Sequence, residues 1–166
     1  FEASYGSKGE WIDMSKVEER LASVGAVVPD VPLPLAAYVP GLVSGNLVYT
    51  SGQLPMANGQ LAFKGRLGEN ASVEDGYAAA RQCACNCLGV VKALIGDLDR
   101  VKRMVKVVGF VNSTADFEAQ PKVVNGASEL LQVAFGEAGA HARSAVGVAA
   151  LPLGAMCEVE IVVEFE

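Results

Sequence analysis

Apart from Val162, residues 157–165 alternate between two kinds of side chain, which is the pattern of a β-strand with two different faces. One face is apolar and the other is acidic: Cys157, Val159, Ile161, Val163 and Phe165 against Glu158, Glu160 and Glu164. A second strand-like run, 142–148, precedes it, and a Pro/Leu/Gly loop lies between the two. We therefore expect the two runs to form a hairpin or a tight corner.

Helix and strand signals follow one another along the rest of the chain. The chain is expected to begin with a short helix up to Gly25, behind a capping box at Ser15 and Glu18, and an extended connector with Pro29, Pro32 and Pro34. A hairpin over 38–51 and a short strand over 60–64 follow. After them we expect a long helix from Ser72 to Gly96, a strand over 101–111 and a second long helix from Pro121 to Gly136. This order predicts an α+β fold with both long helices on one face of the sheet.

The opposite face of that sheet would be bare in a single chain. Val162 lies on the glutamate side of the last strand, and we expect Val105, Val107 and Val108 close to it. A chain with a half-apolar composition and an uncovered sheet face tends to associate. We therefore expect an oligomer that hides this face.

Length and charge limit the class of protein. The chain has 166 residues, of which 51% are hydrophobic, enough for one domain with a full core. Its formal charge of −6 argues against a nucleic-acid partner, because phosphate contacts need clustered Lys and Arg. The basic residues gather over 101–106, where a solvated or edge-protecting role is favoured over RNA binding.

No apolar run approaches the ~20 residues that cross a bilayer, so no membrane partner is expected. The first residues do not resemble a secretion signal, and we expect a cytoplasmic protein. Met14 resembles a native start, so we interpret residues 1–13 as a leader. We divide the chain into an N-terminal extension with a short helix, 1–34, and one domain, 35–166.

The four cysteines do not predict a metal site. Cys83, Cys85 and Cys87 are each separated by a single residue, whereas a zinc knuckle needs two, and the chain has one histidine. On a helix Cys83 and Cys87 share a face and Cys85 points elsewhere. We expect small buried thiols, together with Cys157, in a reducing compartment.

Several motifs in the same order resemble the Rid family, which is also called YjgF-like or endoribonuclease L-PSP. They are Tyr38, Thr50-Ser51-Gly52-Gln53-Leu54-Pro55, Gly109-Phe110-Val111-Asn112, Ala142-Arg143-Ser144-Ala145-Val146-Gly147-Val148, and Leu151-Pro152 through Glu160. The resemblance covers roughly residues 35–165. It implies a chorismate-mutase-like mixed sheet, a trimeric barrel with three clefts between subunits, and hydrolysis of 2-imino acids (2-iminobutanoate or 2-iminopropanoate) to 2-keto acids and ammonia without a cofactor.

The resemblance also implies roles for individual residues. Arg143 matches the arginine that holds the substrate carboxylate, and Glu158 matches the acid that positions the attacking water. The substrate-binding positions are matched by Tyr38, Ser51, Gly52 and Asn125. Ala145 stands where the family often has a cysteine, so any role of that thiol is absent here.

These residue types suit the hydrolysis of an imine. A guanidinium binds a carboxylate through two parallel hydrogen bonds, and a nearby carboxylate can act as a general base. If the last two strands pair as a hairpin, however, Arg143 and Glu158 lie roughly 20 Å apart at ~3.4 Å per residue. Either a bulge shortens this gap or the two residues that serve one substrate come from different chains.

Three readings of function remain open from the sequence. The first is an imine deaminase, and the second is a binding or regulatory protein for a keto acid. The third is an endoribonuclease, which the acidic composition and the lack of stacking aromatics disfavour. We expect His141 to be structural or exposed, and a nucleophilic role for Ser51 is not indicated because the sequence shows it no partner.

Overall fold

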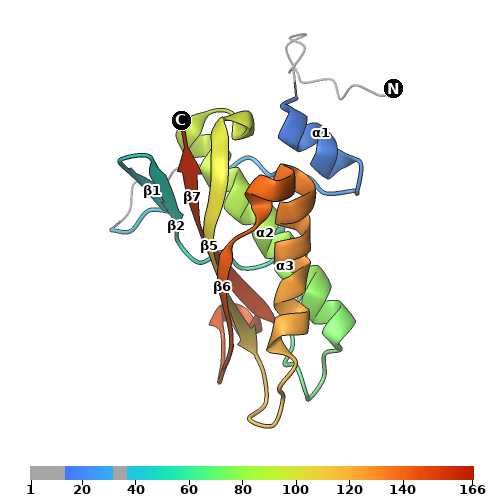
Figure 1. Cartoon of the computed structure of the whole chain (residues 1–166). Coiled ribbons are helices and arrows are strands. Elements are labelled where there is room, and N and C mark those ends of the chain that lie inside the picture. The colour runs from blue at the N-terminus through green and yellow to red at the C-terminus, as the bar shows by residue number, and fades with distance from the viewer. Residues whose placement is uncertain (1–13, 32–36) are drawn as a thin grey trace.

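The computed structural model describes residues 14–31 and 37–166, and Figure 1 shows its arrangement. A five-stranded sheet has the strand order β1-β2-β7-β5-β6. Its strands are β1 (Gly41–Ser44), β2 (Leu47–Thr50), β7 (Cys157–Phe165), β5 (Val101–Asn112) and β6 (Ala142–Val148). A separate small hairpin pairs β3 (Met56–Ala57) with β4 (Gln60–Leu61).

Both long helices, α2 (Val73–Ile95) and α3 (Gln120–Phe135), lie on the same side of the sheet (Figure 1). Ser72 caps α2 in a capping box, Gly96 ends it, proline stands in the first turn of α3 and Gly136 ends that helix. The α+β architecture expected from the sequence is confirmed. Short 3-10 turns, η1 (Leu98–Arg100), η2 (Gly136–Gly139) and η3 (Pro152–Gly154), complete the chain.

The expectation of a terminal hairpin is wrong. β6 pairs in parallel with β5, and β7 pairs antiparallel with β5 and β2, so β6 and β7 lie on either side of β5. Because α3 connects β5 to β6, these three elements form a β-α-β crossover, which leads naturally to parallel strands. The connection over 149–156 therefore carries the chain past β5, and β6 becomes an edge strand.

The two long helices approach each other at a glycine. A Cβ at Gly126 of α3 would lie 2.0 Å from the carbonyl oxygen of Tyr77 on α2, so no larger residue fits without displacing backbone. The surface of α2 that faces the sheet includes the thiols of Cys83 and Cys87, which contact carbonyl groups of β7. All four cysteines are buried and unpaired, as expected from the sequence.

The N-terminal helix α1 (Lys16–Ala22) packs into the same core through Val17 and Leu21. Its first amides donate to the carboxylate of Asp99 at 2.9 Å, and Glu18 forms a 2.6 Å salt bridge with Lys92 of α2. The expected capping box is present, although the helix ends three residues before Gly25.

The other face of the sheet is open in the single chain. Exposed Leu42, Tyr49 and Val146 lie on it, and the register places Val162 and Val108 on the same face. Val107, expected there, instead faces the helices and is fully buried. Coverage of this face by other subunits, and the trimeric barrel, stay predictions.

Smaller differences concern element ends. The first hairpin strand begins at Gly41 rather than at Tyr38, because residues 37–40 bend into it. The strand expected over 60–64 has two residues, and its partner β3 was not expected. Some expectations lie outside the described residues: the leader over 1–13, Pro32 and Pro34 of the connector, and the proposed boundary between 34 and 35.

Candidate functional site

Arg143 lies near the start of β6, and its side chain points to the helix side of the sheet. Its register partner Val107 is fully buried against the helices, and partners across a ladder share a face. Two residues on α3 hold the guanidinium: Nη1 donates to Asn125 Oδ1 at 2.9 Å and to Ser128 Oγ at 3.2 Å. Asn125 and Ser128 are three residues apart, so they lie on one face of the helix. Arg143 and Asn125, both expected from the sequence, are thus brought together.

The remaining donors of Arg143 have little to bind. Nη2 makes one long contact of 3.5 Å with the carbonyl oxygen of Pro121. Within residues 14–31 and 37–166 the guanidinium forms no salt bridge, and each of its hydrogen-bond partners is neutral. The edge formed by Nε and Nη2 therefore has the geometry to bind a carboxylate through two hydrogen bonds.

His141 extends this group of side chains. One ring nitrogen, Nε2, lies 2.9 Å from Ser128 Oγ, and the other, Nδ1, lies 2.6 Å from the carbonyl oxygen of Gly139. Ser128 was not expected in the site, because it lies 13 residues from His141 and the two meet only when α3 packs against β6. No local motif could have shown this contact.

Glu158 belongs to a second group of side chains on the open face. A Cβ at Gly52 would lie 2.0 Å from its Oε1 atom, so glycine leaves the room that this carboxylate occupies. Burial raises the pKa of Glu158 above its usual range, and the neighbouring carboxylate of Glu160 adds to the rise. A raised pKa makes a carboxylate a stronger base when it is ionised.

Ser51 directly precedes Gly52, and Tyr38 lies in the bend that leads into β1. The hydroxyl of Ser51 donates to the carbonyl oxygen of Val39 at 2.6 Å, an arrangement that holds the chain beside β2. Tyr38 is 75% exposed in the single chain. Ser51, Gly52 and Glu158 thus form one cluster, which we call the Glu158 cluster, and Tyr38 adjoins it along the chain through Val39. Arg143, Asn125, Ser128 and His141 form the Arg143 cluster.

The two clusters do not meet within one chain. On the central strand β5, the register partner of Arg143 is Val107, and the register partner of Glu158 is Phe110. Since Val107 and Phe110 are three residues apart, the two charged residues are three register positions apart. An odd number of positions places them on opposite faces of the sheet. The separation is roughly 10 Å along the strands and roughly 10 Å across two of them. This separation of Arg143 and Glu158 is smaller than the roughly 20 Å expected from a hairpin. One small ligand still cannot touch both residues of one chain, because they lie on opposite faces.

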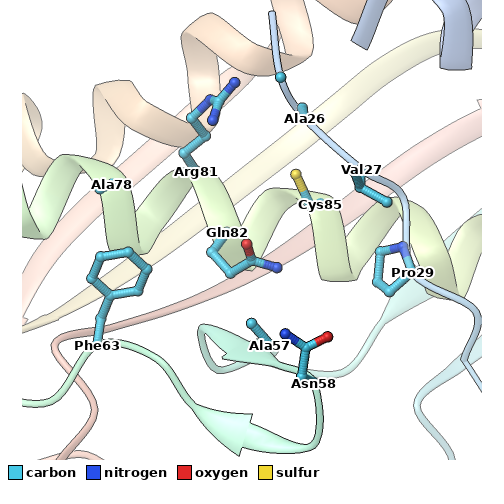
Figure 2. Close-up of a pocket in the computed structure, with 11 residues that line it drawn as sticks. Ala26, Val27, Pro29, Ala57, Asn58, Phe63, Ala78, Arg81, Gln82 and Cys85 are labelled. Carbon is cyan, nitrogen blue, oxygen red and sulfur yellow. The ribbon is translucent and has the colours of Figure 1, made fainter. Parts of the chain in front are cut away.

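A cavity of about 400 Å³ lies elsewhere, on the side of α2 that faces away from the sheet (Figure 2). Figure 2 shows Gln82 and Cys85 of α2 between the connector with Ala26 to Pro29 and the β3–β4 turn at Asn58. None of the residues expected in the functional site lines it. Within the described segments no group of three or more His, Cys, Asp or Glu side chains could hold a metal ion.

A family model described as "YjgF/chorismate_mutase-like, putative endoribonuclease" matches residues 18–165. The chain belongs to the YjgF family. Among curated relatives, protein TCP17 of Trypanosoma cruzi is 45% identical over 150 residues, which cover 90% of this chain and 94% of that protein. The family match begins within α1, whose apolar side chains lie in the hydrophobic core of this chain.

Solved YjgF-like structures agree with this assignment. The protein Atu1372 of Agrobacterium tumefaciens, of unknown function, is 46% identical with a TM-score of 0.83 over 90% of this chain and 93% of that one. The YjgF gene product of Escherichia coli is 28% identical with a TM-score of 0.56, over 84% and 97% of the two chains. Membership supports a small-molecule-binding or endoribonuclease-like protein. In the described part of the chain, no helix is both long and apolar enough to span a membrane.

Proposed function

We propose that this protein is a cofactor-independent deaminase that hydrolyses 2-imino acids to 2-keto acids and ammonia, in clefts between the subunits of a homotrimer. The observation that carries the proposal is the state of Arg143. This half-buried guanidinium is oriented by neutral oxygens, and it has no carboxylate partner among the described residues. Such an arginine is suited to a small organic acid.

Glu158 supplies the base in this proposal. Its pKa is raised by burial and by Glu160, so the ionised form accepts a proton from water more readily than an exposed carboxylate does. Since Glu158 and Arg143 of one chain lie on opposite faces, we infer that the two residues serving one substrate belong to neighbouring chains. Apposition of the Arg143 cluster of one chain with the Glu158 cluster of another, including Ser51 and Tyr38, would complete each cleft.

The proposed chemistry needs no metal, cofactor or nucleophile. Arg143 fixes the carboxylate next to the C=N bond, and Glu158 takes a proton from a water molecule as its oxygen attacks the carbon. The nitrogen takes back the proton from Glu158 to give a carbinolamine. Ammonia leaves when the C–N bond breaks with its electron pair on nitrogen, and the proton of the carbinolamine hydroxyl passes to that nitrogen as the carbonyl forms. General-base assistance of this kind contributes typically ~10²–10⁴-fold. Four unpaired thiols fit a cytoplasmic location for this reaction.

The direct test is turnover of 2-iminobutanoate, generated in the cuvette by a threonine dehydratase. Wild type should accelerate the release of 2-oxobutanoate over the buffer rate, and Arg143→Ala should remove that acceleration. Arg143→Lys is the matched control: it keeps the charge but loses the planar pair of donors, so its activity should fall between the two. Equal rates for wild type, Arg143→Ala and buffer would exclude the deaminase.

Mixing two inactive variants tests the shared cleft. Arg143→Ala and Glu158→Gln are unfolded together at equal concentrations and refolded. If each cleft takes its arginine and its glutamate from different chains, about one quarter of the clefts in the mixed trimers carry both native residues. Activity near this fraction of wild type is expected. No recovery would mean that one chain supplies both residues.

A keto-acid-binding protein without turnover is the second candidate, because Arg143 would hold the carboxylate of a product equally well. It is favoured if 2-oxobutanoate binds to wild type, binding is lost in Arg143→Ala, and no imine hydrolysis is seen. An endoribonuclease finds less support, because Lys102 and Arg103 of the basic run lie within 3.9 Å and 3.8 Å of the Glu164 carboxylate.

A further inference from the structure

Another cavity, of about 330 Å³, lies where the parallel strands β5 and β6 end, against the N-terminal end of α3. Its walls come from the loop after β4, from the loop between β5 and α3, and from the end of β6. Neither Arg143 nor Glu158 lines it. One water molecule takes up about 30 Å³, so this cavity has room for roughly ten. A small organic molecule would therefore fit inside it, and we call it the Arg66 cavity.

Arg66 alone is charged among the described residues that line this cavity. Its Nη2 donates to the carbonyl oxygen of Ser113 at 3.3 Å, whereas Nε is buried without any acceptor. Over residues 14–31 and 37–166 the guanidinium forms no salt bridge, and Nη1 makes no hydrogen bond. A cation that is partly removed from water and lacks a counter-ion favours the binding of an anion.

Ser113 and Gln120 add uncharged donors to the same cavity. Ser113 is only 5% exposed, and in the described part of the chain its hydroxyl makes no hydrogen bond. Gln120 donates through Nε2 to the carbonyl oxygen of Phe117 at 2.7 Å, which leaves its second N–H available. A Cβ at Gly147 would lie 2.6 Å from Ser113 Oγ and 2.8 Å from Gln120 Nε2. Glycine therefore keeps the space in front of both donors open.

The helix beside the cavity favours the same sign of charge. The N-terminal end of a helix carries a partial positive charge, and an anion near it is stabilised. In α3 the N-cap residue, Ala119, makes no side-chain capping bond, and the first turn contains no acidic residue. Asp116 and Glu118 belong to the preceding loop, but neither lines the cavity or forms a salt bridge with Arg66. No carboxylate of the described chain thus occupies the place of an anion.

The loop that carries Arg66 is held in place by backbone hydrogen bonds. The amide of Leu67 donates to the carbonyl oxygen of Asn112 at 2.9 Å, and the amide of Thr114 donates to that of Leu67 at 3.0 Å. The amide of Arg66 itself donates to Asn70 Oδ1 at 2.7 Å. Because the loop is fixed to the end of β5, a ligand would not have to order it, and binding costs less conformational entropy.

We propose that Arg66, Ser113 and Gln120 form a second binding site, for the carboxylate or phosphate group of a small organic molecule. Phe117 and Val148, which also line the cavity, would contact the body of that molecule. An inorganic anion by itself would leave most of the volume to water. This inference goes beyond the proposed deaminase function and does not depend on it, since none of the residues assigned to the deaminase cleft lines the cavity.

The test is titration calorimetry with phenylacetate, phenyl phosphate and inorganic phosphate. All measurements use Arg143→Ala protein, so that the proposed deaminase cleft does not contribute. At least one aromatic anion should bind, and the tighter of the two identifies the source of the oxyanion. Inorganic phosphate should bind more weakly, because it makes no contact with Phe117. Adding Arg66→Gln should weaken binding by about 10- to 100-fold, through loss of charge-assisted hydrogen bonds.

Gly147→Ala changes the same site without removing a charge. Its methyl group would enter the space that Ser113 Oγ and Gln120 Nε2 face, so binding of the tighter aromatic anion should weaken by about 10-fold or more. Lys64→Gln is the matched control for Arg66→Gln. It removes one positive charge two residues away, from a side chain that does not line the cavity, and should change the affinity by less than about twofold.

Thermal melts of each variant identify any that does not fold. Diffraction from wild-type crystals soaked in the tighter aromatic anion provides a measurement that needs no variant, and should place the oxyanion beside Arg66. The proposal is overturned if no probe binds at millimolar concentration, if Arg66→Gln leaves the affinity unchanged, or if Lys64→Gln weakens binding as much as Arg66→Gln. Binding of these anions to a protein that fails the deaminase assay would support this site and count only against the proposed function.

Discussion

Gly52→Ala should move the base of the proposed reaction without unfolding the protein. The added methyl carbon would lie 2.0 Å from Oε1 of Glu158, 2.8 Å from Cδ and 3.0 Å from Cγ, whereas ordinary contact begins at 3.4 Å. The carboxylate must therefore swing away by about 1 Å or more, a displacement that costs about 10²-fold in a positioned reaction. This equals about 2.7 kcal/mol of transition-state stabilisation.

The free energy of unfolding should change far less. The atoms that must move are the end of a flexible side chain, and the backbone at Gly52 does not require positive φ. A loss of stability below about 1 kcal/mol is expected, as for substitutions outside the core. The variant thus separates the position of Glu158 from the stability of the fold.

A double-mutant cycle is the assay. We expect kcat for 2-iminobutanoate to fall by about 10²-fold in Gly52→Ala and by ~10²–10⁴-fold in Glu158→Gln, with little further loss in the double variant, because both changes remove one function. Denaturant unfolding of all four proteins gives the stabilities. A wild-type kcat in Gly52→Ala, or a double variant that loses the product of both single effects, would refute the reasoning.

Three further predictions concern stability and reactivity. Gly126→Ala should lower the free energy of unfolding by about 1–3 kcal/mol or more in a denaturant titration, because its Cβ would meet the carbonyl of Tyr77 at 2.0 Å. Burial opposes ionisation of Glu18, but hydrogen bonds from Lys92 and Ser15 outweigh it and lower the pKa of Glu18 from 4.5. Glu18→Gln should therefore lower the free energy of unfolding by about 1 kcal/mol in urea at pH 7. The difference from wild type should vanish as pH falls through the lowered pKa. Burial raises the pKa of Cys87, so this thiol should react with a disulfide reagent at pH 8 only after denaturant is added, and rapid reaction of the native protein would contradict the structure.

Local signals in the sequence predict much of this fold, because they depend on neighbouring residues. The capping boxes at Ser15 and Ser72 and the glycine after α2 each act within one helical turn, and all three are present. The alternation of residues 157–165 correctly separates the buried face of β7 from its acidic face. Helix and strand assignments were therefore right where one element determines its own pattern.

Strand order was beyond such signals. The loop before β7 contains Pro152 and a positive-φ glycine, Gly154, and looks like a hairpin turn in the sequence. Which strand β6 pairs with depends instead on the crossover through α3, a long-range property. The same limit applies to Val107, whose face is set by its pairing with β6 and β7.

The candidate site divides in a similar way. Arg143 and Asn125 were predicted from the family motif, and the structure joins them by a hydrogen bond. Ser128 and His141 carry no motif, and their contact exists only because η2 turns the chain back along α3.

The division of the charged residues between two faces of one sheet has a genetic consequence if the clefts form as proposed. An allele defective in Arg143 and another defective in Glu158 would partly restore each other in the same cell, although both lie in one gene. Two alleles of the same cluster would not. In a heterozygous cell one defective copy would inactivate clefts only in proportion to its share of the protein, because each defective chain still gives one normal residue to a neighbouring cleft.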